Sequence, residues 1–147
     1  MTTSIPYLNI NRANQDFLPE FKKKLEKVIK SGWVVMGKEL EKFEKDYAKY
    51  SGTRYCIGVA NGLDAIILSL MALDVKEGDE VIVPSNTYIA TLLAVTRVGA
   101  KPVLAEPKID TYNIDSKDIK KAITKKTKAI IPVNLFGQAA EMDKILK

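Results

Sequence analysis

The sequence contains no histidine and only one cysteine among its 147 residues. Without histidine, the chain has no Ser-His-Asp triad, no Cys-His pair and no histidine ligand for a metal ion. A single cysteine, Cys56, rules out an intrachain disulfide and a multi-cysteine zinc site. We therefore predict no metal site and a buried, unreactive thiol at Cys56. Proton transfer would have to use Lys, Asp, Glu, Tyr or Cys side chains.

Long apolar runs are also missing. No apolar stretch reaches the roughly 20 residues that a transmembrane helix needs, and the polar N-terminus lacks the hydrophobic region of a secretory signal peptide. We therefore expect a cytoplasmic protein without a membrane partner. The hydrophobic content of 46% is typical of a globular domain with a buried core.

Blocks of like charge are few, although the net charge is +5 and a nucleic-acid partner has to be considered. Acidic residues interrupt the lysines of residues 38–46, which is typical of the solvated face of a helix. Only residues 22–24 and 117–128 are locally basic. We expect no nucleic-acid partner, and a basic α/β nucleotide-binding module remains an alternative.

The first 50 residues carry two helical patterns and are predicted to form an N-terminal helical segment. Asp16 is the predicted cap of a helix that runs to residue 30 and stops at Gly32. A second amphipathic helix is predicted over residues 38–50. The first helix has one apolar stripe, formed by Phe17, Phe21, Leu25, Val28 and Ile29.

The rest of the chain, residues 51–147, alternates between strand and helix patterns. Strands are predicted at residues 55–60, 80–84, 101–105 and 128–133. Helices are predicted at residues 62–73, 88–98 and from a cap at Asp115 or Ser116 to residue 123. This alternation predicts the α/β class, with a mostly parallel sheet flanked by helices. A last helical pattern starts at residue 141 and is cut short, so we expect an incomplete chain.

One predicted strand turns directly into a helix at Asn61 and Gly62. Backbone N–H groups at a helix start have no partner within the helix, and the helix dipole adds positive charge. A phosphate could bind there, with Gly62 allowing close approach and Asn61 adding a side-chain contact. Gly62 could equally serve only a tight turn.

Two further strand ends carry residues suited to ligand binding, because ligands of open α/β sheets gather beyond the carboxyl ends of the strands. Tyr88 could stack on a flat heteroaromatic cofactor or form a half-buried cap on the sheet. Asn134 and Gln138 could bind a ligand or satisfy backbone groups of their own loop.

Five motifs together resemble the DegT/DnrJ/EryC1/StrS family of sugar aminotransferases, in the family's order and over nearly the whole chain. They are SGW at residues 31–33 leading into GKELEKFE at 37–44, NGLDA at 61–65, PSNTYIAT at 84–91, DTYNID at 110–115 and IPVNLFGQ at 131–138.

The resemblance implies the aspartate aminotransferase fold (fold type I), of which residues 51–147 would be part of the large domain, and a homodimer. It implies pyridoxal 5′-phosphate as cofactor and amino transfer from glutamate to a nucleotide-linked keto-deoxysugar, for amino sugars of lipopolysaccharide or S-layer glycans. A dTDP-linked 3-keto-6-deoxyhexose fits best. Gly62 and Leu63 would bind the cofactor phosphate through their amides, Tyr88 would stack on its ring, and Trp33 would lie near the substrate.

No catalytic residue is assigned within the chain. In the family the Schiff-base lysine and the aspartate that binds the pyridine nitrogen lie beyond the matched region, hence beyond residue 147. The chain also departs from the common Ser-Gly-Thr and His-Leu-Tyr-Gly patterns at Asn61-Gly62-Leu63 and at residues 134–137. A catalytically inactive regulatory relative of the same fold therefore remains an alternative.

Overall fold

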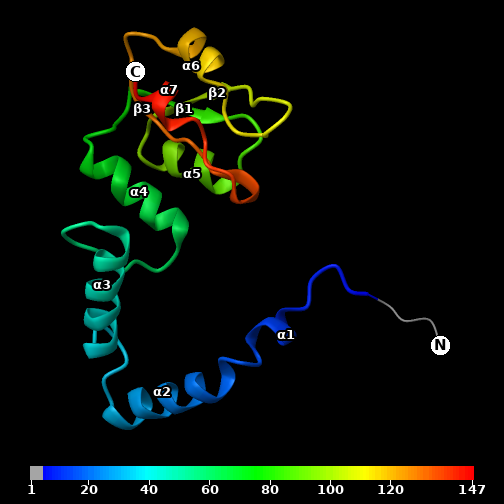
Figure 1. Cartoon of the computed structure of the whole chain (residues 1–147). Coiled ribbons are helices and arrows are strands. Elements are labelled where there is room, and N and C mark those ends of the chain that lie inside the picture. The colour runs from blue at the N-terminus through cyan, green and yellow to red at the C-terminus, as the bar shows by residue number, and fades with distance from the viewer. Residues whose placement is uncertain (1–4) are drawn as a thin grey trace. The chain divides into compact units, whose positions relative to one another are not determined.

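The computed structural model describes residues 5–147 and divides the chain into two compact units, Met1–Gly58 and Val59–Lys147 (Figure 1). Each unit is described by itself. The division into segments 1–50 and 51–147 stays a prediction. Within the described residues, no helix is both long and apolar enough to cross a membrane.

The first unit contains helices α1 (Ile10–Asn14), α2 (Leu18–Ser31) and α3 (Lys38–Ser51). The prediction that Asp16 caps the helix ending near residue 30 was wrong, because that helix, α2, begins after Phe17, which makes no side-chain cap bond. Gly32 ends α2 and Gly52 ends α3, both in the left-handed conformation that glycine adopts without steric cost. The predicted helix stop at Gly32 is confirmed.

The strand predicted at residues 55–60 does not form. No described strand of this unit is available to pair with it, and a strand without a ladder leaves its backbone groups unsatisfied. The segment is instead tied to α3, where the Gly58 amide donates to Glu44 Oε1 over 2.7 Å. Cys56 is half-buried, rather than fully buried as predicted.

The second unit is a three-stranded parallel sheet with helices on both faces, which confirms the predicted α/β class. Its strands are β1 (Glu80–Pro84), β2 (Lys101–Ala105) and β3 (Thr127–Ile130), in the order β2-β1-β3. Its other elements are α4 (Gly62–Ala72), α5 (Ile89–Arg97), α6 (Ser116–Ala122), a 3-10 turn at Leu135–Gly137 and α7 (Met142–Ile145). The strand β3 is shorter than predicted.

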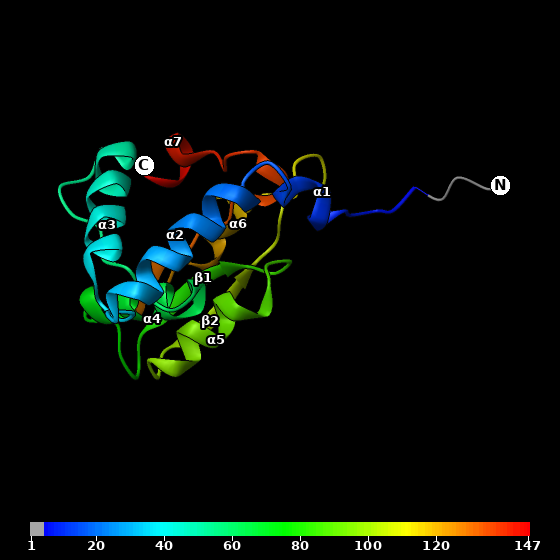
Figure 2. The same ribbon diagram turned by 90° about the horizontal axis from the view of Figure 1, so that it is seen from below.

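The core of this unit lies on both faces of β1. Val81 and Val83 point to one face and Ile82 to the other, and all three are fully buried. In Figure 1, α4 and α5 lie below the sheet and α6 lies above it, while Figure 2 shows α5 alongside the strands. A sheet covered on both faces directs its ligands to the ends of its strands.

Candidate functional site

The carboxyl ends of the three parallel strands lie at one edge of the sheet. Val83 pairs with Leu104 and Ile82 with Ile130, so the segments that follow β1, β2 and β3 leave the sheet together. These segments are residues 85–88, 106–115 and 131–138. They contain two of the three strand ends that the sequence singled out, those of Tyr88 and Asn134.

The start of α4 is capped by the side chain of Asn61. Its backbone is extended (φ −162°, ψ 174°), its Oδ1 accepts from the Asp64 amide and its Nδ2 donates to Asp64 Oδ2, both over 3.0 Å. Both polar ends of this side chain are therefore engaged in the cap. The predicted phosphate contact of Asn61 stays a prediction.

The amides of Gly62 and Leu63 are the first two of α4, and neither donates a hydrogen bond to any of the described residues. A Cβ placed on Gly62 would meet no atom within 4 Å, so the space beside these donors is open. Two free amides, open space and the helix dipole fit a phosphate group. The Asp64 carboxylate in the first turn opposes an anion, so the amides have to provide the attraction.

Tyr88 occupies the N-cap position of α5, directly after the segment that leaves β1. Its side chain is 77% exposed, so the interpretation as a half-buried cap on the sheet was wrong. The hydroxyls of Thr87 and Thr91 hydrogen-bond each other over 2.9 Å beside it, and the Tyr88 side chain makes no cap bond. The ring is therefore free to stack on a planar ligand.

Helices α4 and α5 pack on the same face of β1 and share one core cluster. Leu63, at the start of α4, packs against the cluster that contains Ala94 and Val95 of α5. The start of α4 with the free amides of Gly62 and Leu63 (the phosphate corner) and the start of α5 with the ring of Tyr88 (the aromatic corner) therefore belong to the same unit. That they hold one ligand between them stays a prediction.

Trp33 belongs to the first unit, in the connector between α2 and α3. Its ring is 65% exposed, and its Nε1 donates to the Val35 carbonyl over 2.6 Å. It lines a pocket of about 570 Å³ together with residues of both helices, among them Val28 and Leu40. The substrate role of Trp33 stays a prediction.

Side-chain amides of the loops form contacts that the sequence did not reveal. Asn134 Oδ1 accepts from the Ala140 amide over 2.9 Å, which confirms that Asn134 satisfies its own loop. Asn113 is buried and bonds the turn that contains Phe136, and Asn86 Nδ2 donates to the Tyr112 carbonyl. The contacts of Asn113 and Asn86 span 22 to 26 residues, so no local pattern signals them.

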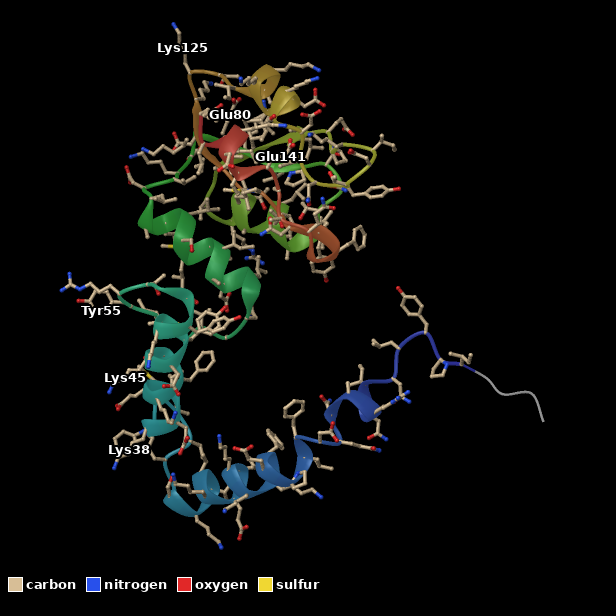
Figure 3. All side chains as sticks on the ribbon, in the orientation of Figure 1. Lys38, Lys45, Tyr55, Glu80, Lys125 and Glu141 are labelled. Atoms are coloured by element: carbon tan, nitrogen blue, oxygen red, sulfur yellow. The ribbon has the colours of Figure 1, made fainter. Side chains whose placement is uncertain are left out.

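Two carboxylates of the unit, Glu141 and Glu80, have pKa values that are lowered by hydrogen bonds from distant parts of the chain. The hydrogen bond from Lys108, with a second from Lys144, lowers the pKa of Glu141 to about 2. The hydroxyl of Thr124 lowers the pKa of Glu80 by hydrogen bonding. Figure 3 shows Glu80 and Glu141 within the body of the unit, whereas Lys125 points away from it. The described residues contain no group of three or more side chains suited to a metal ion.

A sequence model of the DegT/DnrJ/EryC1/StrS aminotransferase family matches residues 16–147. The chain belongs to this family. Its sequence is 50% identical over 141 residues to that of a dTDP-3-amino-3,6-dideoxy-alpha-D-galactopyranose transaminase of Aneurinibacillus thermoaerophilus. That alignment covers 96% of this chain and 39% of the relative.

Two solved structures resemble this one closely. The crystal structure of DesV from S. venezuelae, in complex with a ketimine intermediate, superposes with a TM-score of 0.95 at 42% identity, over 99% of this chain and 39% of DesV. NtdA from Bacillus subtilis, with bound cofactor PMP, gives a TM-score of 0.94 at 36% identity, over 99% of this chain and 34% of NtdA. The chain therefore has the fold of the corresponding part of these aminotransferases and spans about two fifths of the length of its relatives.

Proposed function

We propose that the chain is part of an enzyme that transfers an amino group from glutamate to a nucleotide-linked keto-deoxysugar, with pyridoxal 5′-phosphate as cofactor. The observation that carries the proposal is the pair of free amides at the start of α4, in the same unit as an exposed Tyr88 ring. The similarity to a dTDP-amino-sugar transaminase at 50% identity supports a dTDP-linked sugar with the keto group at carbon 3.

The residues of this chain would hold the cofactor rather than react with it. The amides of Gly62 and Leu63 would donate to its phosphate, and Tyr88 would lie against its ring. When bound, the cofactor supplies a carbonyl group that carries the amino group and a ring that accepts electrons. No lysine of this chain is assigned to the chemical step.

The proposal includes a cytoplasmic homodimer that makes amino sugars for lipopolysaccharide or S-layer glycans. The apolar stripe formed by Phe17 and residues of α2 supports association, because Phe17, Phe21 and Ile29 are each at least 60% exposed. Several lysines that raise the net charge have acidic partners, as in Lys24–Glu20 and Lys30–Glu26. This pairing favours a small anionic substrate over a nucleic acid.

The phosphate corner can be tested by removing one amide while keeping the helix. Proline is favoured at the first helical position, and the extended Asn61 satisfies the restriction that proline places on the residue before it. Gly62→Pro should therefore leave α4 intact and weaken binding of pyridoxamine 5′-phosphate. A hydrogen bond to a charged group contributes about 1.5–3 kcal/mol, so the dissociation constant should rise about 10- to 100-fold.

The matched control is Gly62→Ala, which keeps the amide and introduces a Cβ into open space. Binding is followed by NMR through the amide of residue 63 and the ring signals of Tyr88 in all three proteins, and through the amide of residue 62 in the wild type and Gly62→Ala. The wild-type chain should show shifts at both corners. Shifts at neither corner, or equal affinities for Gly62→Pro and Gly62→Ala, would contradict the proposal.

A further inference from the structure

Two aromatic residues at the carboxyl edge of the sheet have unfavourable backbone conformations. Tyr112 and Phe136 have φ values of 58° and 53°, in the left-handed region that bulky side chains rarely adopt. Their side chains are 50% and 86% exposed, so burial of the rings does not compensate for this cost. Conformations of this kind persist only where the surroundings impose them, and they gather at functional sites.

The side chain of Asn113 holds the turn that contains Phe136. Asn113 is only 4% exposed, its Oδ1 accepts from the Leu135 amide and its Nδ2 donates to the Gln138 carbonyl, both over 3.0 Å. One buried side chain thus bonds the turn on both sides of Phe136. Both of its polar ends are satisfied, which fixes the spacing between the segments that follow β2 and β3.

The same network reaches the segment that carries Tyr88. Asn86 Nδ2 donates to the Tyr112 carbonyl over 3.0 Å, and Asn86 lies two residues before Tyr88. The rings of Tyr112 and Phe136 meet edge to face, with centroids 6.1 Å apart and planes at 85°. The rings therefore form one rim, defined as Tyr112 and Phe136, which is connected to the Tyr88 segment through Asn86.

A turn with no role beyond joining elements would not need this rim. Glycine fits a left-handed position without steric cost, as Gly137 does in the same turn with a φ of 80°. Phe136 instead places a large apolar ring in solvent at a position that disfavours it. The combination indicates that the ring is kept for contact with a ligand.

We propose that Asn113 is a positioning residue that holds Tyr112 and Phe136 as a rigid aromatic rim, and that this rim contacts the sugar ring of the nucleotide-linked substrate. The inference rests on the proposed function for the identity of the substrate. The keto carbon has to reach the cofactor ring beside Tyr88. The base is separated from the sugar by a diphosphate, so the sugar and not the base lies at this edge. Apolar C–H groups of a deoxysugar suit an aromatic surface.

The test is an NMR titration of the chain with dTDP-glucose, with thymidine diphosphate in a parallel titration. The ring signals of Tyr112 and Phe136 should shift with dTDP-glucose and not with thymidine diphosphate. Asn113→Ala should weaken dTDP-glucose binding about five-fold, the effect of losing one well-placed aromatic contact. It should also speed exchange of the Leu135 amide. Asn9→Ala is the matched control, because Asn9 likewise accepts from a backbone amide through its side chain, at the start of α1.

Phe136→Gly separates ligand contact from folding. Glycine accepts the local conformation, so the melting temperature should stay the same or rise while dTDP-glucose binding weakens. The inference is overturned if the ring signals do not respond to dTDP-glucose, if thymidine diphosphate gives equal shifts, or if Phe136→Gly and Asn113→Ala bind like the wild type. Failure of the proposed function has a different signature, namely no response of residues 62 and 63 to pyridoxamine 5′-phosphate.

Discussion

The two units of the chain differ in how their helices are stabilised. In the described part of Met1–Gly58, Ala48 is the only buried residue, and α2 has no buried residue at all. In Val59–Lys147, β1 is buried along its whole length and two clusters of buried side chains cover its faces. The first unit has amphipathic helices without a core, and the second has a core built on a sheet.

The helices of the first unit have to be stabilised by local interactions. Helix α2 has the pairs Glu20–Lys24 and Glu26–Lys30 at the i,i+4 spacing and a glycine stop. Each such pair contributes only about 0.2–0.5 kcal/mol, and helices of this length are marginal in water without packing. The same amphipathic pattern therefore gives a stable element only where a sheet or another partner covers its apolar stripe.

Removing side chains of equal size from the two units should destabilise them to very different extents. Ile82→Ala empties a fully buried position in the central strand and should lower the free energy of unfolding by about 2–5 kcal/mol. Ile29→Ala on α2, where the side chain is 61% exposed, should change the free energy of unfolding of the monomer, measured at high dilution, by less than about 0.5 kcal/mol. Guanidinium unfolding followed by circular dichroism measures both. Equal losses would show that α2 is covered in solution.

Local chemistry explains what the sequence could predict. Gly32 and Asp115 act on their own neighbours, and the predicted C-terminal end of α2 and the predicted start of α6 followed from them. The strands β1 and β2 were predicted with the correct ends, because apolar runs bounded by turns indicate buried parallel strands. The strand at residues 55–60 was wrong, because a strand also needs a neighbour, and an apolar run does not reveal whether one is present.

The candidate site likewise contains features that the local sequence predicts and features that depend on contacts between distant segments. Exposure of Tyr88 and the free amides at Gly62 and Leu63 follow from their places at helix starts, which the sequence predicted. The contacts of Asn113 join segments more than 20 residues apart and depend on the order of strands in the sheet. No residue type or spacing in the sequence determines that order. The turn that contains Phe136 is likewise held by contacts from outside it.

The two predicted helix caps, Asp115 and Asp16, should differ in the same direction in their effects on stability. Asp115 Oδ1 accepts from the Lys117 amide over 2.9 Å, so Asp115→Ala should lower the free energy of unfolding by about 1 kcal/mol. Asp16→Ala should have no effect beyond about 0.5 kcal/mol, because α2 begins after Phe17 without a side-chain cap. Urea titrations of both variants under one condition measure the difference. A loss at Asp16 as large as that at Asp115 would contradict the assigned start of α2.

Lowering the pH should produce the smallest of these changes in stability, and it should do so by protonating Glu141. Lys108 and Lys144 hold the pKa of Glu141 at about 2, below its usual value of 4.5. A carboxylate whose pKa is lowered on folding stabilises the folded state above its unfolded pKa, and this contribution is lost as the pH falls. The loss should therefore occur between about pH 4.5 and pH 2, where the bond between α7 and the segment after β2 breaks.

The measurement is the urea midpoint of unfolding at pH 6, 4 and 3 for the wild type and for Glu141→Gln. The variant cannot gain stability by ionising, so its midpoint should fall less steeply over this range than that of the wild type. Glu77→Gln is the control, because it removes the same charge from an exposed position in the same unit. Its pH dependence should match that of the wild type. If the urea midpoints of Glu141→Gln and Glu77→Gln change with pH in the same way, the ion pair between Lys108 and Glu141 does not stabilise the sheet-based unit. The stability of that unit then depends on the buried faces of β1 and not on this ion pair.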